Sequence, residues 1–206
     1  MKKEEALAVV FACAQKYMEN LANRKLLFIC FDKHRNLYSF EVTFDISNFL
    51  HLTGLKANHM SAKDFFHRCL DRRLTVNDFE LADSGTTPMK LQILPVLVSK
   101  NLKANMVGNI NVQKPKLYTE KLAGNIQGCI GFVKDSKSGR YVPNTVLKED
   151  IRNNVSHADR IILTYRKSAA EDTYSEIVYS AKKIDWATFI LPEKYSDLPL
   201  PKANND

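Results

Sequence analysis

The first hydrophobic positions of the chain recur at helical spacing, and they end in a basic pair. They are Leu7, Val10, Phe11, Ala14, Met18 and Leu21. Glu4 and Glu5 at the start and Arg24 and Lys25 at the end suit the dipole of a helix. The pattern predicts an amphipathic helix that belongs to the folded domain. A secretory signal peptide, the alternative for such a start, fits less well because the pattern continues beyond a cleavage point near residues 12–14.

The next two segments have the pattern of a β-hairpin. Residues 26–31 form a continuous apolar run, typical of a buried strand, and residues 32–36 are polar and turn-like. Hydrophobic and polar residues then alternate, with Tyr38, Phe40, Val42 and Phe44 on one predicted face. This period of two predicts a second strand, half-buried, that pairs with the first.

Start and stop signals predict three further helices. Asp45 can cap a short helix over residues 46–53, which Gly54 ends in a left-handed turn. A capping box begins a second helix over residues 61–72, and a first-turn proline begins a third over residues 86–101.

From residue 105 onward the composition favours strands. They are predicted over residues 106–110, 117–123, 126–133, 160–167 and 175–181. We therefore expect an α+β fold, with a helical N-terminal half packed on a twisted, mainly antiparallel sheet. The expected organisation is a helix over residues 1–25 that belongs to the same domain, a single domain over residues 26–190 and an irregular tail over residues 191–206.

Charge indicates the class of partner. The 206-residue chain has a formal net charge of +7, and such a surplus of Lys and Arg attracts phosphate polyanions. The alternative is a basic protein whose charge only keeps it soluble. We expect a nucleic acid as the partner.

Other features narrow the class of protein. Three of the four cysteines lie in apolar runs, which predicts buried thiols in a reducing compartment and neither disulfides nor a zinc site. No metal and no cofactor is expected. No apolar run is long enough to span a bilayer, so we expect a cytoplasmic protein with no membrane partner.

His51 and Glu120 are the candidate proton carriers. His51 follows Leu50 at the end of the predicted short helix, on the side away from its buried residues. An imidazole that titrates near neutral pH can give or take a proton in phosphodiester cleavage. The alternative for His51 is a structural histidine that binds a nearby carbonyl. Glu120 can serve as a general base, and its alternative is a solvated strand residue.

Cationic and aromatic residues form the candidate binding surface. The strand over residues 160–167 begins apolar and ends with Tyr165, Arg166, Lys167 and Ser168. A fixed Arg stabilises the charge of a phosphoryl transition state, so Arg166 and Lys167 are catalytic candidates. The alternative is an exposed strand end. The remaining substrate-binding candidates are Tyr118, Lys121 and Lys148, besides Tyr165 and Ser168.

Several short blocks, in order, resemble one known group of families. The blocks are NFLHLTGL (48–55), AKDFF (62–66), DSGTT (83–87), KLYTEKLAG (116–124), YVPNT (141–145), LKEDIR (147–152) and YRKS (165–168). Together they resemble the phage-type branch of the Barnase–EndoU–colicin–RelE (BECR) nuclease-like families, which occur in phages and other bacterial mobile elements. The resemblance covers residues 26–184.

The resemblance implies a fold and a chemistry. It implies helices packed on a twisted antiparallel sheet, with RNA bound against the open face of that sheet. It also implies RNA cleavage without a metal, in which the 2′-hydroxyl attacks the adjacent phosphate and leaves a cyclic phosphate. This reaction needs a base, an acid and cations around the phosphorus. The candidates are His51 or Glu120 for the proton transfers, Arg166, Lys167 and Lys121 for the charge, and Tyr118 or Tyr165 for base stacking.

Two other functions remain as alternatives. A non-catalytic inhibitor or regulator, of the anti-defence type, would bind RNA or a ribonucleoprotein through the same basic surface. A nucleotide-using transferase is a third alternative, but the sequence has no clear signature for its cofactor.

Overall fold

The computed structural model describes residues 1–111 and 118–202. Within these residues the chain forms the helices α1 (Lys3–Asn20), α2 (Asn48–Thr53), α3 (Ala62–Leu70) and α4 (Thr87–Leu97), with the 3-10 turns η1 (Ile151–Asn153) and η2 (Glu193–Tyr195). The strands are β1 (Arg24–Phe31), β2 (Leu37–Phe44), β3 (Leu55–Ala57), β4 (Phe79–Leu81), β5 (Met106–Asn109), β6 (Lys121–Gly124), β7 (Cys129–Lys134), β8 (Tyr141–Leu147), β9 (Asp159–Ser168) and β10 (Glu176–Ser180).

The large sheet curls until it closes on itself. Its hydrogen-bonded order is β1-β2-β8-β7-β6-β5-β9-β10, and β1 also pairs with β9. Seven strands therefore form a ring, and β10 continues along the edge of β9 beyond β5. Among the strand pairs described, β2 and β8 pair in parallel, through Val42 and Tyr141. The other described pairs are antiparallel.

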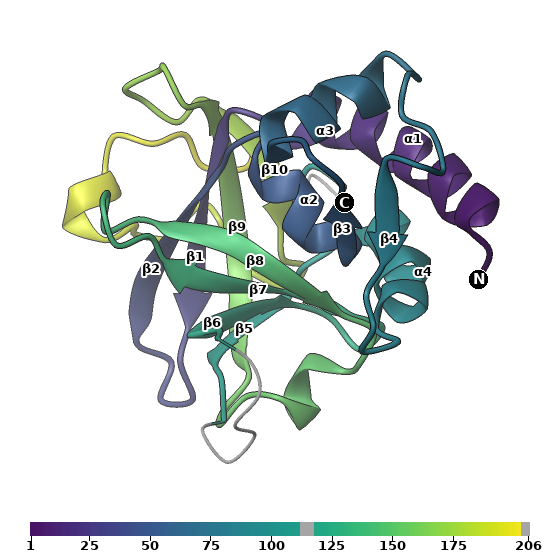
Figure 1. Cartoon of the computed structure of the whole chain (residues 1–206). Coiled ribbons are helices and arrows are strands. Elements are labelled where there is room, and N and C mark those ends of the chain that lie inside the picture. The colour runs from purple at the N-terminus through teal and green to yellow at the C-terminus, as the bar shows by residue number, and fades with distance from the viewer. Residues whose placement is uncertain (112–117, 203–206) are drawn as a thin grey trace.

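Helices α1 to α4 gather on one side of this ring, while the β1–β2 turn and the start of β9 lie at the opposite, lower end in Figure 1. The junction is aromatic. The Tyr17 ring of α1 packs edge-on against Phe44 of β2 and Phe66 of α3, and tilted against Phe49 of α2. Its hydroxyl donates to the Asp45 carbonyl oxygen at 2.8 Å, so the buried phenol is satisfied.

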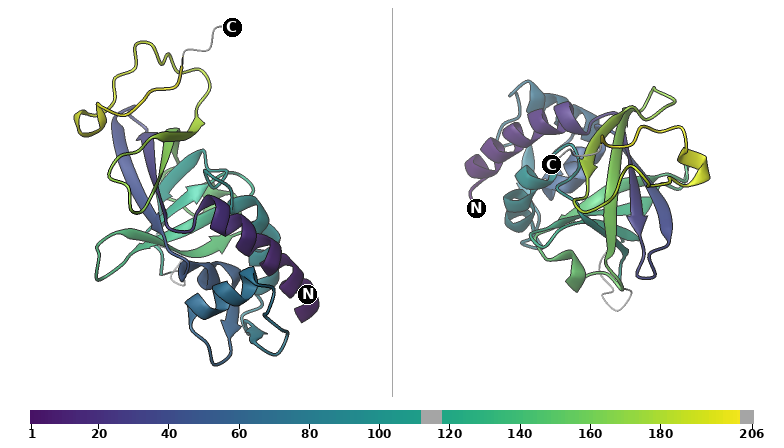
Figure 2. Two further views of the ribbon diagram at one scale, coloured as in Figure 1. Left: turned by 90° about the horizontal axis from the view of Figure 1, so that it is seen from above. Right: turned by 180° about the vertical axis from the view of Figure 1, so that it is seen from behind.

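A second apolar layer covers the outside of β1 and β9. The C-terminal segment crosses this face of the ring, as the two views of Figure 2 show. Trp186 and Leu191 are buried there, and Leu198 and Leu200 pack against the same cluster. The tail has little regular structure, but its described part is packed.

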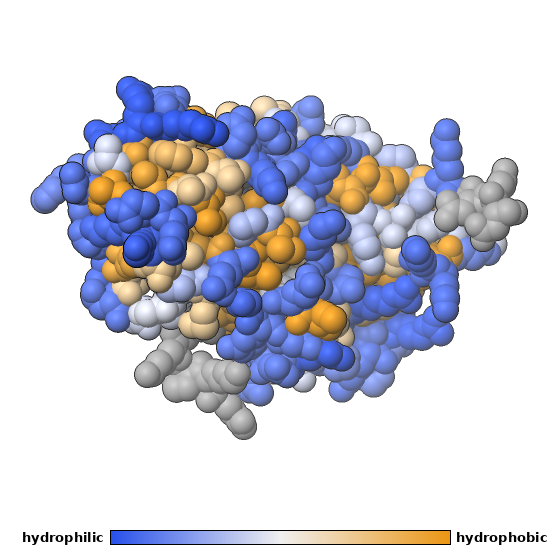
Figure 3. Space-filling model, turned by 90° about the vertical axis from the view of Figure 1, so that its right-hand side faces the viewer, coloured by the Kyte–Doolittle hydropathy of each residue, from blue (hydrophilic) through white to orange (hydrophobic). Residues whose placement is uncertain are grey.

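The helical side of the surface is mixed in character. Seen from the right-hand side of Figure 1, hydrophobic residues reach the surface in several patches among hydrophilic ones (Figure 3). Met18 of α1 and Met89 of α4 are among the exposed hydrophobic side chains. In the part of the chain that the structure describes, no helix combines the length and the apolarity that a membrane span requires.

Much of the predicted architecture is confirmed. The α+β class, the presence of an N-terminal helix, the β1–β2 hairpin and the capping box of α3 are as expected, and all four cysteines are buried free thiols. The first helix is shorter than predicted, because it ends at Asn20 and Arg24 and Lys25 belong to β1. Gly54 ends α2 in a left-handed turn as predicted, but this helix begins at Asn48 and Ser47, not Asp45, occupies its N-cap position. The buried face of α1 is rotated from the prediction, because Tyr17 faces the core and Met18 does not.

Other expectations need correction. The helical N-terminal half is only partly confirmed, since the four helices alternate with β1 to β4 and two of those strands belong to the ring. The third predicted helix ends at Leu97, not near residue 101. The strand predicted over residues 117–123 begins at Lys121, and its residue 117, with residue 116 of the family block, lies outside the described residues.

Candidate active site

The inner face of the ring changes from apolar to polar at the end far from the helices. Alternate residues of a strand face the same side. In three strands a buried apolar residue is followed, two positions toward this end, by a polar one: Phe40 by Tyr38, Ala123 by Lys121 and Ile161 by Asp159. We call this end, marked by Tyr38, Lys121 and Asp159, the ring mouth.

Asp159 joins a tyrosine and a histidine at the ring mouth. Its Oδ2 accepts a hydrogen bond from the Tyr38 hydroxyl at 2.6 Å, and its Oδ1 lies 3.5 Å from His157 Nε2. Burial, together with the bond to Asp159, raises the pKa of Tyr38 above its usual value, so the phenol stays protonated and continues to donate. The His157 side chain is 52% exposed. An imidazole held by a carboxylate and open to solvent is suited to acid–base catalysis.

Gly108 of β5 allows the segment before His157 to lie close to the sheet. A Cβ at this position would stand 2.3 Å from the carbonyl oxygen of His157 and 2.8 Å from Cβ of Val155. The backbone N–H of Ser156 donates to the Asn109 carbonyl oxygen at 3.0 Å, which secures the same segment. Any larger residue at Gly108 would push His157 out of place.

Lys121 of β6 supplies the positive charge of the ring mouth. Its Nζ donates to Asn109 Oδ1 at 2.7 Å and lies 5.3 Å from the centre of the Phe40 ring. Desolvation lowers the pKa of Lys121, and the nearby charge of Asp159 partly opposes this effect. A partly desolvated ammonium interacts more strongly with an oxyanion than one in bulk water.

Glu120 directly precedes Lys121 in the chain. One of its carboxylate oxygens accepts the backbone N–H of Lys134 at 3.0 Å. Burial, and after it the carboxylate of Glu120, raises the pKa of Tyr141. The charges of Asp159 and Glu120 both act on the Lys121 ammonium, so this lysine lies near both carboxylates.

A cavity of about 370 Å³ opens beside the His157–Asp159 pair. Its walls include Lys33 and Arg35 from the β1–β2 turn and Arg160 from β9. The cavity thus brings proton carriers and several cations to one opening, which is the combination that a phosphodiester substrate requires.

The comparison with known proteins identifies a family. The family model described as phage-Barnase-EndoU-ColicinE5/D-RelE like nuclease4 (PBECR4) matches residues 10–183. The chain belongs to this nuclease-like family. The matched span contains every strand of the ring and the whole ring mouth. No curated protein and no solved structure gives a significant match.

In this PBECR4 chain Arg166, predicted as a catalytic cation, has internal partners. Its Nε and Nη2 donate to the two carboxylate oxygens of Glu176 at 2.7 and 2.9 Å, and its Nη1 donates to the Asn20 carbonyl oxygen at 3.0 Å. Its side chain is 10% exposed. These contacts favour a structural role, since the guanidinium joins β9 to β10 and to the end of α1.

Tyr165 and Lys167, on the opposite face of β9, also have internal partners. Lys167 Nζ donates to the Asp172 carbonyl oxygen at 2.7 Å and lies 4.6 Å from the centre of the Tyr174 ring. The ring of Tyr165 is fully buried and its hydroxyl donates to the Pro199 carbonyl oxygen, which makes it unsuitable for base stacking. Ser168 accepts the backbone N–H of Ala170 in the turn after the strand.

His51, Lys148 and Tyr118 are all exposed but lie in different places. His51 is in α2, and its carbonyl oxygen accepts a hydrogen bond from Lys90 Nζ at 3.4 Å. Lys148 follows β8 and donates to Gln92 Oε1 of α4 at 2.7 Å. Tyr118 is 92% exposed, two residues before Glu120. The contacts described do not connect His51 or Lys148 with the ring mouth.

Of the predicted residues, the structure brings Glu120 and Lys121 together. Sequence reasoning missed Tyr38, His157 and Asp159, which complete the ring mouth. It placed Tyr38 on the hydrophobic face of a predicted strand, and it assigned no role to His157 or Asp159. The available signal was the pair His157 and Asp159 at the start of a strongly apolar strand, where the inner face of the sheet becomes polar.

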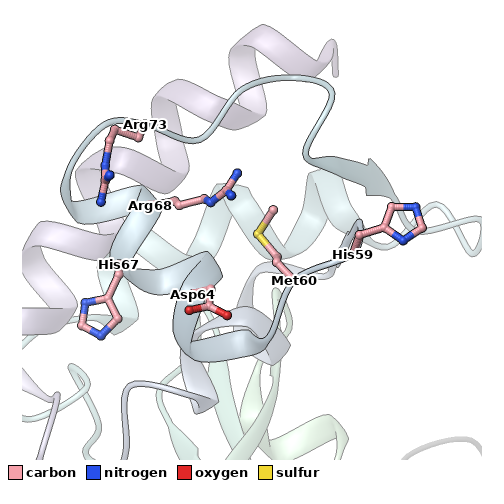
Figure 4. A pocket seen from close by; sticks show the side chains of 6 residues that line it. All are labelled: His59, Met60, Asp64, His67, Arg68 and Arg73. Carbon is pink, nitrogen blue, oxygen red and sulfur yellow. The ribbon is translucent and has the colours of Figure 1, made fainter.

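A second pocket, of about 420 Å³, lies over α3, away from the ring mouth (Figure 4). Its lining residues are His59, Met60, Asp64, His67, Arg68 and Arg73. Its charges are paired within the chain, because Arg68 contacts Asp78 and Arg73 contacts Asp71. Across residues 1–111 and 118–202, no group of three or more His, Cys, Asp and Glu residues is placed to hold a metal ion.

Proposed function

We propose that the chain is a ribonuclease that cleaves RNA without a metal ion, by attack of the 2′-hydroxyl on the adjacent phosphate at the ring mouth. The observation that carries the proposal is the contact series His157–Asp159–Tyr38 beside Lys121 and Glu120. Membership of a nuclease-like family supports a phosphodiester substrate. The positive net charge supports a polyanion as the partner.

The proposed reaction uses Glu120 and His157 as its two proton carriers. Glu120 accepts the proton of the 2′-hydroxyl as this oxygen bonds to phosphorus. The bond from phosphorus to the 5′-oxygen breaks, and the imidazolium of His157 gives this oxygen a proton. The products are a 2′,3′-cyclic phosphate and a free 5′-hydroxyl. Asp159 orients the imidazole, as a carboxylate does for other catalytic histidines.

Cations and an aromatic residue complete the proposed site. Lys121 binds the non-bridging oxygens, which gain negative charge in the transition state. Tyr118, exposed and close in sequence to Glu120, is the proposed stacking residue for a base. In this proposal Arg166 and Lys167 hold the fold together, and His51 has no catalytic role.

The test is an RNA cleavage assay in excess chelator. A labelled single-stranded RNA is incubated with the purified chain, and the product ends are analysed for cyclic phosphate. We expect cleavage that His157→Ala lowers by about 10²- to 10⁴-fold, since general acid–base catalysis contributes effects of this size. His51→Ala is the matched control and keeps the activity.

Other outcomes would overturn the proposal. Cleavage that requires a divalent cation, or that is unchanged in His157→Ala, contradicts the mechanism. RNA binding by the wild-type chain without any cleavage would instead describe the non-catalytic inhibitor or regulator, and a ribonucleoprotein would then be the partner to test.

A further inference from the structure

A groove leads from the ring mouth along the start of β9. The cavity beside His157 shares Ala158 and Arg160 with a second cavity of about 600 Å³. The second cavity continues to Tyr179 at the end of β10 and to Lys182. Because the two cavities have residues in common, they lie next to each other, and together they extend from His157 to Lys182.

The cations and the carboxylates along this groove differ in whether they have a partner within the chain. The charged side-chain groups of Lys33, Arg35 and Lys182 have no hydrogen-bond or ion-pair partner among the residues that the structure describes. The two carboxylates of the path are already satisfied. Asp32 accepts the backbone N–H groups of His34 and Asn36 and the side-chain amide of Asn36, and Asp159 is bonded to Tyr38.

Arg160 stands where the two cavities meet. One of its Nη atoms donates to the Lys182 carbonyl oxygen at 2.9 Å, which fixes the guanidinium to the groove wall. A guanidinium has five N–H donors, so this contact leaves others for a phosphate. The Arg160 charge also acts on the hydroxyl of half-buried Tyr179, so the cation and the aromatic residue are close together.

We infer that this groove binds the single-stranded RNA that continues from the cleaved phosphate, with Lys33, Arg160 and Lys182 along its backbone. The inference rests on the ribonuclease function proposed above and adds a strand path to it. Unpaired RNA fits for two reasons. Proteins that read RNA beside an aromatic side chain bind splayed-out bases. A 2′-oxygen must also rotate into line with the departing 5′-oxygen, which a regular duplex hinders.

The test measures binding separately from cleavage. The probes are a dinucleotide and an octanucleotide whose 2′-hydroxyls are replaced by fluorine, so that neither can be cleaved. The variant is Lys33→Gln with Lys182→Gln, and the control with the same charge change is Lys16→Gln with Lys63→Gln on the exposed helices. All four lysines are exposed, so both double variants should fold.

We expect the groove variant to bind the octanucleotide about tenfold more weakly than the control does, with little change for the dinucleotide. The salt dependence of octanucleotide binding should become shallower by about 0.7 in log–log slope for each phosphate that the groove no longer neutralises. Equal octanucleotide binding by the two double variants would overturn the groove. If the wild-type chain bound a hairpin duplex of the same length as tightly as the octanucleotide, or more tightly, the preference of the groove for single strands would be overturned.

Cleavage of unmodified RNA separates the two proposals. If the wild-type chain cleaves RNA and the groove variant keeps the same KM for long substrates, the groove is refuted and the ribonuclease stands. If the wild-type chain binds the probes as expected but cleaves no RNA, the catalytic proposal fails and the strand path stands.

Discussion

The two ends of strand β9 both carry charged residues, but the fold uses them in different ways. At the start of the strand, Asp159 and Arg160 face a cavity, and the histidine beside them is half exposed. At its end, Arg166 and Lys167 are buried and each has a partner supplied by the same chain.

The difference arises from what lies opposite each end. The pairing of β10 with β9 sets Glu176 directly beside Arg166, so the guanidinium finds a carboxylate without leaving the sheet. Asp159 has the apolar Val107 as its partner in β5, and it contacts a tyrosine and a histidine. A charge can act on a ligand only when the fold leaves it incompletely satisfied, and this condition favours the start of β9.

The carboxylates at the two ends give the most direct test of this comparison. Asp159→Asn should lower RNA cleavage by about 10²- to 10³-fold, because the imidazole loses the carboxylate that orients it. The amide oxygen can still accept the Tyr38 hydroxyl, so the fold should be kept. Glu176→Gln at the other end should leave the rate per folded molecule unchanged. Initial rates and a thermal melt of each variant provide the measurement, and an equal drop in rate in both variants would contradict the comparison.

The lysines sharpen the same contrast. Lys121→Met should reduce the cleavage rate by about 10²-fold, since a single donor to a developing oxyanion is worth this much. Lys167→Met should leave that rate unchanged in the folded fraction, because its ammonium contacts Asp172 and Tyr174 inside the chain. Rates are compared at saturating RNA, so that weaker binding is not mistaken for slower chemistry. A large drop in rate in Lys167→Met alone would mean that the active site lies at the end of β9.

Local signals in the sequence were sufficient for many elements. Gly54 located the end of α2 and the Ser61 capping box located the start of α3, and strict alternation located β2 and predicted its pairing with β1. These features depend on residues a few positions apart. Closure of the sheet through β1 and β9 joins residues that lie far apart in the chain, such as Phe28 and Thr164, and no local pattern encodes it.

The candidate site was predicted only in part for the same reason. Glu120 and Lys121 were found because they are polar residues in a strand segment. Tyr38 was placed only on the hydrophobic face of a predicted strand, and its contact with Asp159 spans 121 positions. At the end of β9, the charges of Arg166 and Lys167 were visible in the sequence, whereas the internal partners that occupy them were not.

The structural role of Arg166 can be measured as stability. Arg166→Met should lower the free energy of unfolding by about 1–3 kcal/mol, because Glu176 and the Asn20 carbonyl lose their donor in a partly buried setting. Arg160→Met, at the exposed start of the strand, should change it by less than about 0.5 kcal/mol. Urea titrations of both variants give the two values. If Arg160→Met were the more destabilising change, the structural role would belong to the start of β9 and not to its end.

The smallest expected effect concerns Tyr165, which lies on the same face of β9 as Lys167. Burial raises the pKa of Tyr165 to about 12, whereas a phenol in the unfolded chain titrates near 10. The unfolded chain therefore loses this proton first, so the stability that the neutral phenol contributes is complete below pH 10 and declines as the pH rises toward 12. Tyr165→Phe should cost about 1 kcal/mol at pH 8, because the hydrogen bond to the Pro199 carbonyl is removed, and this difference from the wild-type chain should shrink by pH 11. Chemical denaturation at both pH values measures it, and exposed Tyr118→Phe should show neither effect. A difference that grew with pH would mean that this tyrosine ionises more easily in the folded chain than in the unfolded one, which its burial against the C-terminal segment opposes.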